Sequence, residues 1–162
     1  VNNSVNKQKN FITLDKGRRQ GVKTDMGVVA DHGIVGIIVG VSENFSVAMS
    51  LLNLDFKTSA RLRSNGYFGS LNWDGSDYRQ VLLNEIPQHV VVQPGDTIET
   101  TGFSSIFPEG VMIGIVSEVE QTGSDFHNIK VLLQEDFKKL SFVSIVGNLS
   151  KRERMQLEEQ YQ

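Results

Sequence analysis

Three histidines are the residues of this chain that could act as general bases or bind a metal ion. They are His32, His89 and His127, and no two of them have the i, i+4 spacing of a helical metal site. A serine hydrolase needs a histidine beside a serine and an orienting carboxylate, which Asp55 could supply. Neither G-x-S-x-G nor G-D-S-G occurs in the sequence. A serine peptidase therefore remains a hypothesis that no sequence motif supports.

The composition excludes several other kinds of chemistry. The 162 residues include no cysteine, which rules out disulfides, thiolate metal sites and thiol catalysis. Residues 74–77, D-G-S-D, lack the further alternating oxygens of a calcium loop, and Asp-Gly is a common hairpin turn. No glycine-rich phosphate-binding motif is present, and the net charge is −3. We therefore predict no metal, no cofactor and no nucleic-acid partner.

Four aromatic residues close together form the candidate partner-binding surface of the chain, namely Tyr67, Phe68, Trp73 and Tyr78. Glycines at 66, 69 and 75 surround them, and aromatic side chains on such a loop-rich hairpin suit a protein interface. In a strand, however, Tyr67 and Trp73 share one face and Phe68 takes the other, so part of the set would belong to the core. Both interpretations stay open.

Short apolar, β-branched stretches separated by turn residues must position these side chains. They lie at 11–14, 28–30, 34–41, 47–52, 58–62, 67–73, 79–83, 97–101, 112–119, 129–133 and 142–146. Strands of this length and spacing are typical of an all-β sandwich or barrel. Residues 33–39 also resemble residues 110–116, each an apolar stretch with an internal glycine. A duplication predicts two similar small barrels, and coincidence among Val-, Ile- and Gly-rich strands explains the similarity equally well.

A series of motifs runs through the chain in a fixed order. N-F-I-T-L-D-K-G at 10–17 is followed by G-I-V-G at 33–36, G-D-T-I-E-T-T-G at 95–102, F-P-E-G at 107–110 and D-F-K-K-L at 136–140. This order resembles the extracytoplasmic domain of the bacterial rod shape-determining MreC family, up to about residue 146, with Thr101 where serine is usual. The motif positions that the resemblance marks as structural are Gly17, Gly21, Gly33, Gly36, Gly95, Asp96, Thr101, Gly102, Phe107, Pro108, Gly110, Gly114, Asp136 and Phe137.

The resemblance implies an all-β fold of two small, mainly antiparallel, six-stranded β-barrels packed together, with short helical pieces at both termini. We place the first barrel at 11–88, which a strand from the C-terminal part could complete, and the second at 89–149. Residues 1–10 would end an upstream helix or coiled coil. Residues 150–162 would be a polar tail, either a short helix or disordered, in which Ser150 and Glu153 have the spacing of a capping box.

The resemblance also implies a function, as a non-catalytic scaffold of the cell-elongation machinery that controls rod shape. The scaffold would bind and organise a class B penicillin-binding transpeptidase and link it, through MreD, to the MreB filament system. It would dimerise through an upstream coiled coil. It would lie on the periplasmic, extracytoplasmic face of the inner membrane, which it would touch only through a transmembrane helix ahead of Val1. A trypsin-like two-barrel periplasmic peptidase and an adaptor of an envelope transport system are the competing classes.

Overall fold

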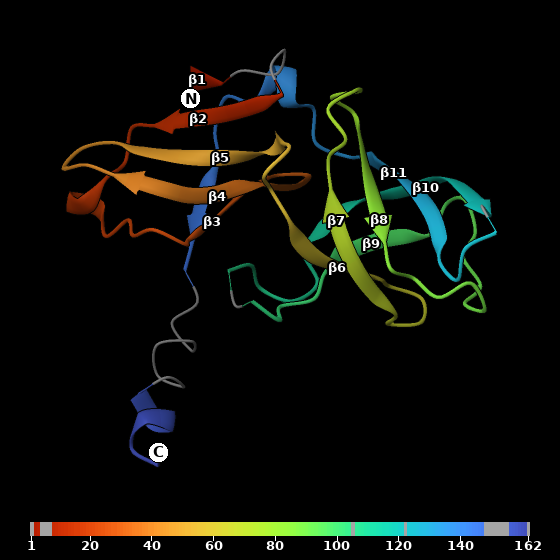
Figure 1. Cartoon of the computed structure of the whole chain (residues 1–162). Coiled ribbons are helices and arrows are strands. Elements are labelled where there is room, and N and C mark those ends of the chain that lie inside the picture. Colours follow the sequence, from red (N-terminus) through yellow and green to blue (C-terminus); the bar gives the residue numbers. More distant parts are fainter. Residues whose placement is uncertain (1, 4–7, 105, 122, 148–155, 162) are drawn as a thin grey trace.

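The strands of the protein form two units that lie side by side (Figure 1). The computed structural model describes all residues except 1, 4–7, 105, 122, 148–155 and 162. One unit is a six-stranded sheet with the order β1-β2-β5-β4-β3-β12, and the other is a closed barrel with the order β10-β11-β8-β7-β6-β9. The strand pairs in both units are antiparallel. The predicted all-β class is confirmed.

The six-stranded sheet, called the first sheet below, is built mainly from the N-terminal third of the chain. Its strands are β1 (Asn2–Asn3), β2 (Lys9–Leu14), β3 (Gly27–Ala30), β4 (Gly33–Val41), β5 (Ser46–Asn53) and β12 (Ser144–Val146), and the 3-10 turn η1 (Arg18–Gln20) follows β2. Exposure alternates along β2, so that Ile12 and Leu14 enter the core. The first half of β4 is buried on both faces because β10 of the barrel lies against it.

The closed barrel occupies the middle of the chain. Its strands are β6 (Thr58–Leu62), β7 (Phe68–Asn72), β8 (Gln80–Asn84), β9 (Thr97–Thr100), β10 (Met112–Gln121) and β11 (His127–Leu133), and the 3-10 turn η2 (Phe137–Lys139) follows β11. Side chains at alternate positions, among them Leu62, Leu71, Leu83, Ile98 and Val131, fill its interior. Small barrels of this kind are packed cores rather than pores.

Only one of the two predicted barrels is closed. In the first sheet the end strands β1 and β12 are not paired with each other in the part of the chain that the structure describes. β12 contributes only three residues to the sheet. A hollow of about 640 Å³ lies between the end of β2 at Leu14 and residues 141–145, which comprise the segment before β12 and the start of β12.

The division of strands between the two units also differs from the prediction. We expected β6, β7 and β8 in a first barrel over 11–88, but β6 pairs with β9 and β8 pairs with β11, so all three belong to the closed barrel. The chain then returns to the first sheet, where β12 pairs with β3. The barrel, residues 58–133, is therefore an insertion within the first sheet. Local apolar patterns mark strands but do not specify which strands pair.

Of the two termini, only the N-terminal one differs from the expected helical piece. Asn2 and Asn3 form a strand beside Ile12 and Thr13 of β2, because asparagine is a poor helix former and β2 offers an edge for pairing. At the other end, residues 156–159 form one helical turn that lies apart from both units (Figure 1). The capping-box residues at 150 and 153 fall outside the described residues. No helix in the described part of the chain is long and apolar enough to span a bilayer.

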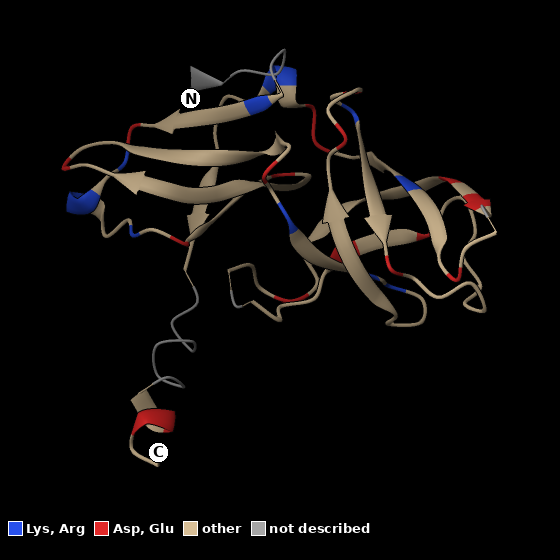
Figure 2. Ribbon diagram, in the orientation of Figure 1, with Lys and Arg blue, Asp and Glu red and all other residues tan. Residues whose placement is uncertain are grey.

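Charges of both signs are distributed over the sheet and the barrel (Figure 2). The basic turn η1 illustrates the pattern, because Arg18 and Arg19 lie 4.0 and 3.2 Å from the carboxylate of Glu43 in the β4–β5 turn. Gly17, just before η1, allows this approach, since a Cβ there would overlap the carbonyl oxygen of Ser42. The two arginines of η1 are thus paired on the surface with a glutamate of the neighbouring β4–β5 turn.

Candidate protein-interaction site

The four predicted aromatic residues do not form one surface. Trp73 is only 3% exposed, and its indole Nε1 donates a hydrogen bond to the carbonyl oxygen of Asp77 at 2.8 Å. It continues the inward-facing phase of Leu71, so its interpretation as a partner-binding residue is wrong and the core interpretation holds. Tyr78 is half-buried, with the ammonium of Lys138 4.4 Å from its ring centre.

Of the four predicted aromatic residues, Tyr67 and Phe68 have exposed side chains. A third exposed ring, from another part of the chain, lies against Phe68. Phe68 is 54% exposed and packs edge-to-face against Phe103, which is 60% exposed, with 4.8 Å between the ring centres. Tyr67 packs edge-on against the ring of His89 at 6.1 Å. We call Phe68 and Phe103 the aromatic pair. Phe103 was missed by the sequence analysis, and its position directly after the G-D-T-I-E-T-T-G motif was the available signal.

A groove of about 240 Å³ lies beside the aromatic pair. It is lined by Lys57, Thr58, Ser59, Phe68, Gly69, Ser70 and Glu85. A side chain on Gly69 would overlap the carbonyl oxygen of Asn84, so the glycine allows β7 and β8 to approach here. Glu85 adopts a left-handed backbone conformation with a φ of 71°, unusual for a non-glycine residue and costing roughly 1–3 kcal/mol. An aromatic wall with a polar and charged rim is typical of a protein interface.

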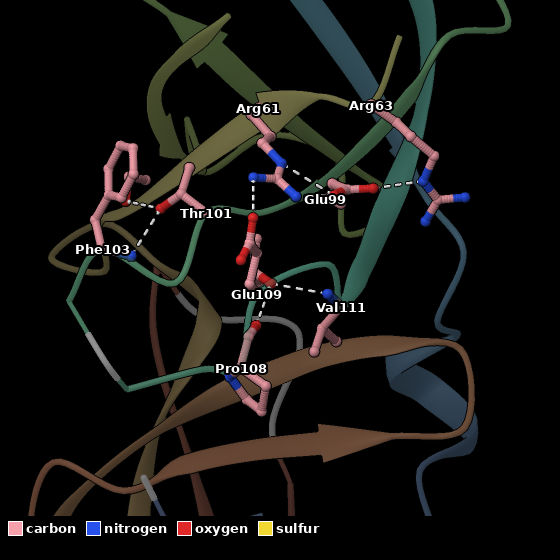
Figure 3. A network of polar contacts seen from close by, with 10 residues as sticks. Arg61, Arg63, Glu99, Thr101, Phe103, Pro108, Glu109 and Val111 are labelled. Atoms are coloured by element: carbon pink, nitrogen blue, oxygen red, sulfur yellow. Dashed lines mark hydrogen bonds and ion pairs between the residues drawn. The ribbon is translucent and has the colours of Figure 1, made fainter. Parts of the chain in front are cut away.

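The loop between β9 and β10, residues 101–111, carries Phe103 and is held at both ends by hydrogen bonds (Figure 3). At its start, the hydroxyl of Thr101 lies 2.8 Å from that of Ser59 on β6 and accepts a hydrogen bond from the backbone N–H of Phe103 at 3.1 Å. At its end, the hydroxyl of Thr100 donates to the carbonyl of Pro108 at 2.6 Å and accepts from the N–H of Val111 at 2.8 Å. The motif threonines therefore fix the loop.

A charge network attaches the same loop to β6. The carboxylate of Glu99, whose side chain is 6% exposed, accepts hydrogen bonds from Arg61 at 2.6 and 3.0 Å and from Nε of Arg63 (Figure 3). Arg61 also donates to the carboxylate of Glu109 at 2.5 Å. The hydrogen bond from Arg63, together with those from Arg61, holds the pKa of Glu99 below its ordinary value, although burial acts in the opposite direction. Glu99 therefore remains charged. Loss of one arginine would destabilise the fold, because the cost of burying the carboxylate would be less fully compensated.

The other motif residues occupy turns and close contacts. Gly21, Gly95, Gly102 and Gly110 have a left-handed backbone, Asp96 and Asp136 accept hydrogen bonds from backbone N–H groups of their turns, and Phe107 and Phe137 are buried. Phe107 has a particular role because its ring lies against Gly27 of β3, where a Cβ would come within 2.8 Å of the ring. The β9–β10 loop thus connects the barrel to the first sheet.

The histidines are engaged in packing and backbone contacts. Nε2 of His127 hydrogen-bonds to the carbonyl of Val90 at 2.7 Å, and its buried Nδ1 has no hydrogen-bond partner within the described residues. The ring of His89 packs on Tyr67, and the backbone N–H of His32 donates to Glu135 at 2.9 Å. Among the described residues, no three His, Asp or Glu side chains are grouped so that they could hold a metal ion.

The inserted barrel, the six-stranded sheet beside it and the motif loop that joins them define a class of two-unit β domains. The family model for the barrel core of the rod shape-determining protein MreC matches residues 1–147. The chain belongs to this family, which confirms the resemblance given by the order of its motifs.

Similar proteins include cell shape-determining MreC proteins from Listeria monocytogenes, 29% identical over 112 residues, and Bacillus subtilis, 33% identical over 119 residues. Each alignment covers 67% of this chain, which corresponds to 38% and 41% of the length of those relatives. The chain thus spans about two fifths of the curated relatives that it matches.

Solved MreC structures share the fold. MreC from Listeria monocytogenes superposes with a TM-score of 0.81 at 24% identity, covering 88% of this chain and 70% of that one. MreC from Pseudomonas aeruginosa gives 0.78 at 21% identity, with coverages of 84% and 88%. A chain of the complex between penicillin-binding protein (PBP2) and MreC from Helicobacter pylori gives 0.63 at 19% identity, with coverages of 76% and 78%.

Proposed function

We propose that this chain is the part of a cell-shape scaffold that binds a class B penicillin-binding transpeptidase, and that the aromatic pair is the centre of the contact. The observation that carries the proposal is the pair itself, two phenylalanine rings that are more than half exposed yet packed against each other. The proposal is supported by membership in a rod shape-determining family and by the solved complex of a related MreC with a penicillin-binding protein.

The physical case rests on what binding would do to these rings. Exposed aromatic side chains gain contact area at low cost in side-chain entropy, and such residues often supply most of the binding free energy of an interface. The groove beside Phe68 would receive a side chain of the partner, while Lys57 and Glu85 on its lining would take part in polar contacts at the rim. Tyr67, exposed next to Phe68, belongs to the same proposed surface.

Calorimetric titration against the extracytoplasmic region of the transpeptidase tests the proposal. Phe68→Ala and Phe103→Ala should each weaken binding about tenfold or more, as expected for a central interface residue. Phe142→Ala is the matched control, because Phe142 is 92% exposed but lines the hollow beside Leu14 of the first sheet. Wild-type affinity in both Phe68→Ala and Phe103→Ala would refute the assignment of the surface.

The proposal extends to the whole scaffold. The chain would act without catalysis on the periplasmic side of the inner membrane, anchored by an upstream transmembrane helix and dimerised by an upstream coiled coil. MreD and the MreB filament system would be its further partners. The alternative of a trypsin-like peptidase finds no support at two of the histidines, because the ring of His127 bonds to a backbone carbonyl and that of His89 packs on Tyr67.

A further inference from the structure

We propose that Thr101 is the positioning residue of the aromatic pair: its hydroxyl holds the β9–β10 loop on β6 and so fixes Phe103 against Phe68 before a partner binds. This inference rests on the proposed function, since it names the group that prepares the proposed surface. It assigns Thr101 no contact with the partner, because the residue is buried.

The first step is the geometry of the Thr101 hydroxyl. A hydroxyl offers one donor and two acceptor positions, so Oγ1 can engage Ser59 at 2.8 Å and accept from the N–H of Phe103 at 3.1 Å at the same time. Ser59 lies opposite Ser70 of β7, two residues from Phe68. The backbone of Phe103 is thereby attached to β6, the strand that pairs with β7, and β7 carries the other ring of the pair.

The second step is that the loop is attached to β6 again near its far end. Arg61, two residues after Ser59 on β6, donates to Glu109 and lies opposite Phe68 in the sheet. Glu99 holds Arg61 in place from the neighbouring strand β9. The two ends of the loop lie close together at Gly102, where an added Cβ would be 3.2 Å from the Cβ of Glu109. Phe103 therefore projects from a loop whose two ends are both fixed to β6.

The third step is the consequence for binding. An exposed ring on an unrestrained loop loses backbone and side-chain freedom when a partner binds, and this loss reduces affinity. A ring already fixed against Phe68 avoids most of that loss. Removal of the Thr101 hydroxyl should therefore weaken binding by about three- to tenfold, without removal of any group that touches the partner.

The experiment compares Thr101→Val, which keeps the branched shape but removes the hydroxyl, with Thr101→Ser, which keeps the hydroxyl. Amide hydrogen exchange of the free protein comes first: the N–H of Phe103 should exchange at least about tenfold faster in Thr101→Val and near the wild-type rate in Thr101→Ser. Titration with the extracytoplasmic region of the transpeptidase follows. Thr101→Val should bind three- to tenfold more weakly, and should have no further effect in a Phe103→Ala background.

Each outcome decides a separate point. Unchanged exchange at Phe103 in Thr101→Val overturns the positioning role, whatever the partner does. A second outcome is that Thr101→Val exchanges faster at Phe103 and yet binds with wild-type affinity. If Phe103→Ala does weaken binding, that result overturns the effect of positioning on binding. If neither Phe68→Ala nor Phe103→Ala weakens binding, the proposed function fails while the exchange result still decides whether Thr101 fixes the loop. If Thr101→Val does not fold, Ser59→Ala replaces it in the exchange measurement only, because Ser59 also lines the proposed groove.

Discussion

At the scale of single residues, both units contain a glycine that faces a carbonyl oxygen of a neighbouring strand at close range. A Cβ on Gly36 would overlap the carbonyl oxygen of Met49 in β5, and a Cβ on Gly114 would overlap that of Leu132 in β11. These two glycines are the internal ones of the similar stretches 33–39 and 110–116. The stretches share a physical requirement, which is that a long strand must come close to its neighbour at one point.

This requirement predicts different outcomes for two glycines of the same strand. Gly36→Ala should lower the free energy of unfolding by about 2 kcal/mol, because the added methyl group must push β5 away. Gly40→Ala should leave it unchanged or raise it by roughly 0.5 kcal/mol, since nothing lies within 4 Å of the added carbon and glycine in a strand is entropically unfavourable. Urea titrations measure both values. Equal stability of the two variants would contradict the argument.

The residues of the candidate site could be predicted only in part. The two-residue period of a strand correctly separates Trp73, which is buried, from Phe68, which is exposed. The same period wrongly places Tyr67 with Trp73, because Tyr67 precedes β7 and is exposed. Phe103 could not be found in this way, because its contact with Phe68 spans 35 residues and depends on how the β9–β10 loop folds back on β6. Glu99 posed the same difficulty, since its ion pairs are with Arg61 on β6 and with Arg63 just after that strand.

At the scale of elements, the apolar stretches located most strands but not their partners. The stretch at 34–41 corresponds closely to β4 (Gly33–Val41), and that at 129–133 lies within β11 (His127–Leu133). Pairing depends on which edges meet in three dimensions, which a local pattern does not encode. β12 shows this most clearly, because it pairs with β3, a strand more than a hundred residues earlier in the sequence.

A charge placed in β12 tests its role in the first sheet. Ile145 lies opposite Val28 and packs against the core, so Ile145→Asp should destabilise the first sheet by about 2 kcal/mol or more. Ser144→Asp is the control, because Ser144 is exposed in the same strand. Hydrogen exchange should show a larger loss of protection in β3 and β4 than in β6 to β11. Equal loss across the barrel would argue against β12 as a local part of the first sheet.

At the scale of the whole molecule, a few contacts join the two units. The ring of Phe107 lies against Gly27 of β3, Gly33 of β4 lies against the backbone at Met112, and the N–H of His32 donates to Glu135. Because two chain crossings and an apolar contact link the barrel to the first sheet, we expect the units to unfold together in the wild-type protein.

Truncation of one buried ring should separate the two units. Phe107→Ala should cost about 3 kcal/mol and split the single calorimetric transition into two, since the ring is buried between the loop and the first sheet. Phe103→Ala on the same loop, where the ring is exposed, should leave the single transition in place. A single, merely shifted transition in Phe107→Ala would show that the other contacts suffice to couple the units.

The insertion of the barrel has a consequence for the order in which the protein assembles. Every protein chain is synthesised from its N-terminus, and Ile145 of β12 follows its partner Val28 of β3 only after the whole barrel has been made. Until then the edge of β3 is unpaired, and an unpaired strand edge is a template for association with other chains. The barrel is continuous in sequence and can fold in that interval. The last strand therefore ends the period in which the edge of β3 is open to association with other chains.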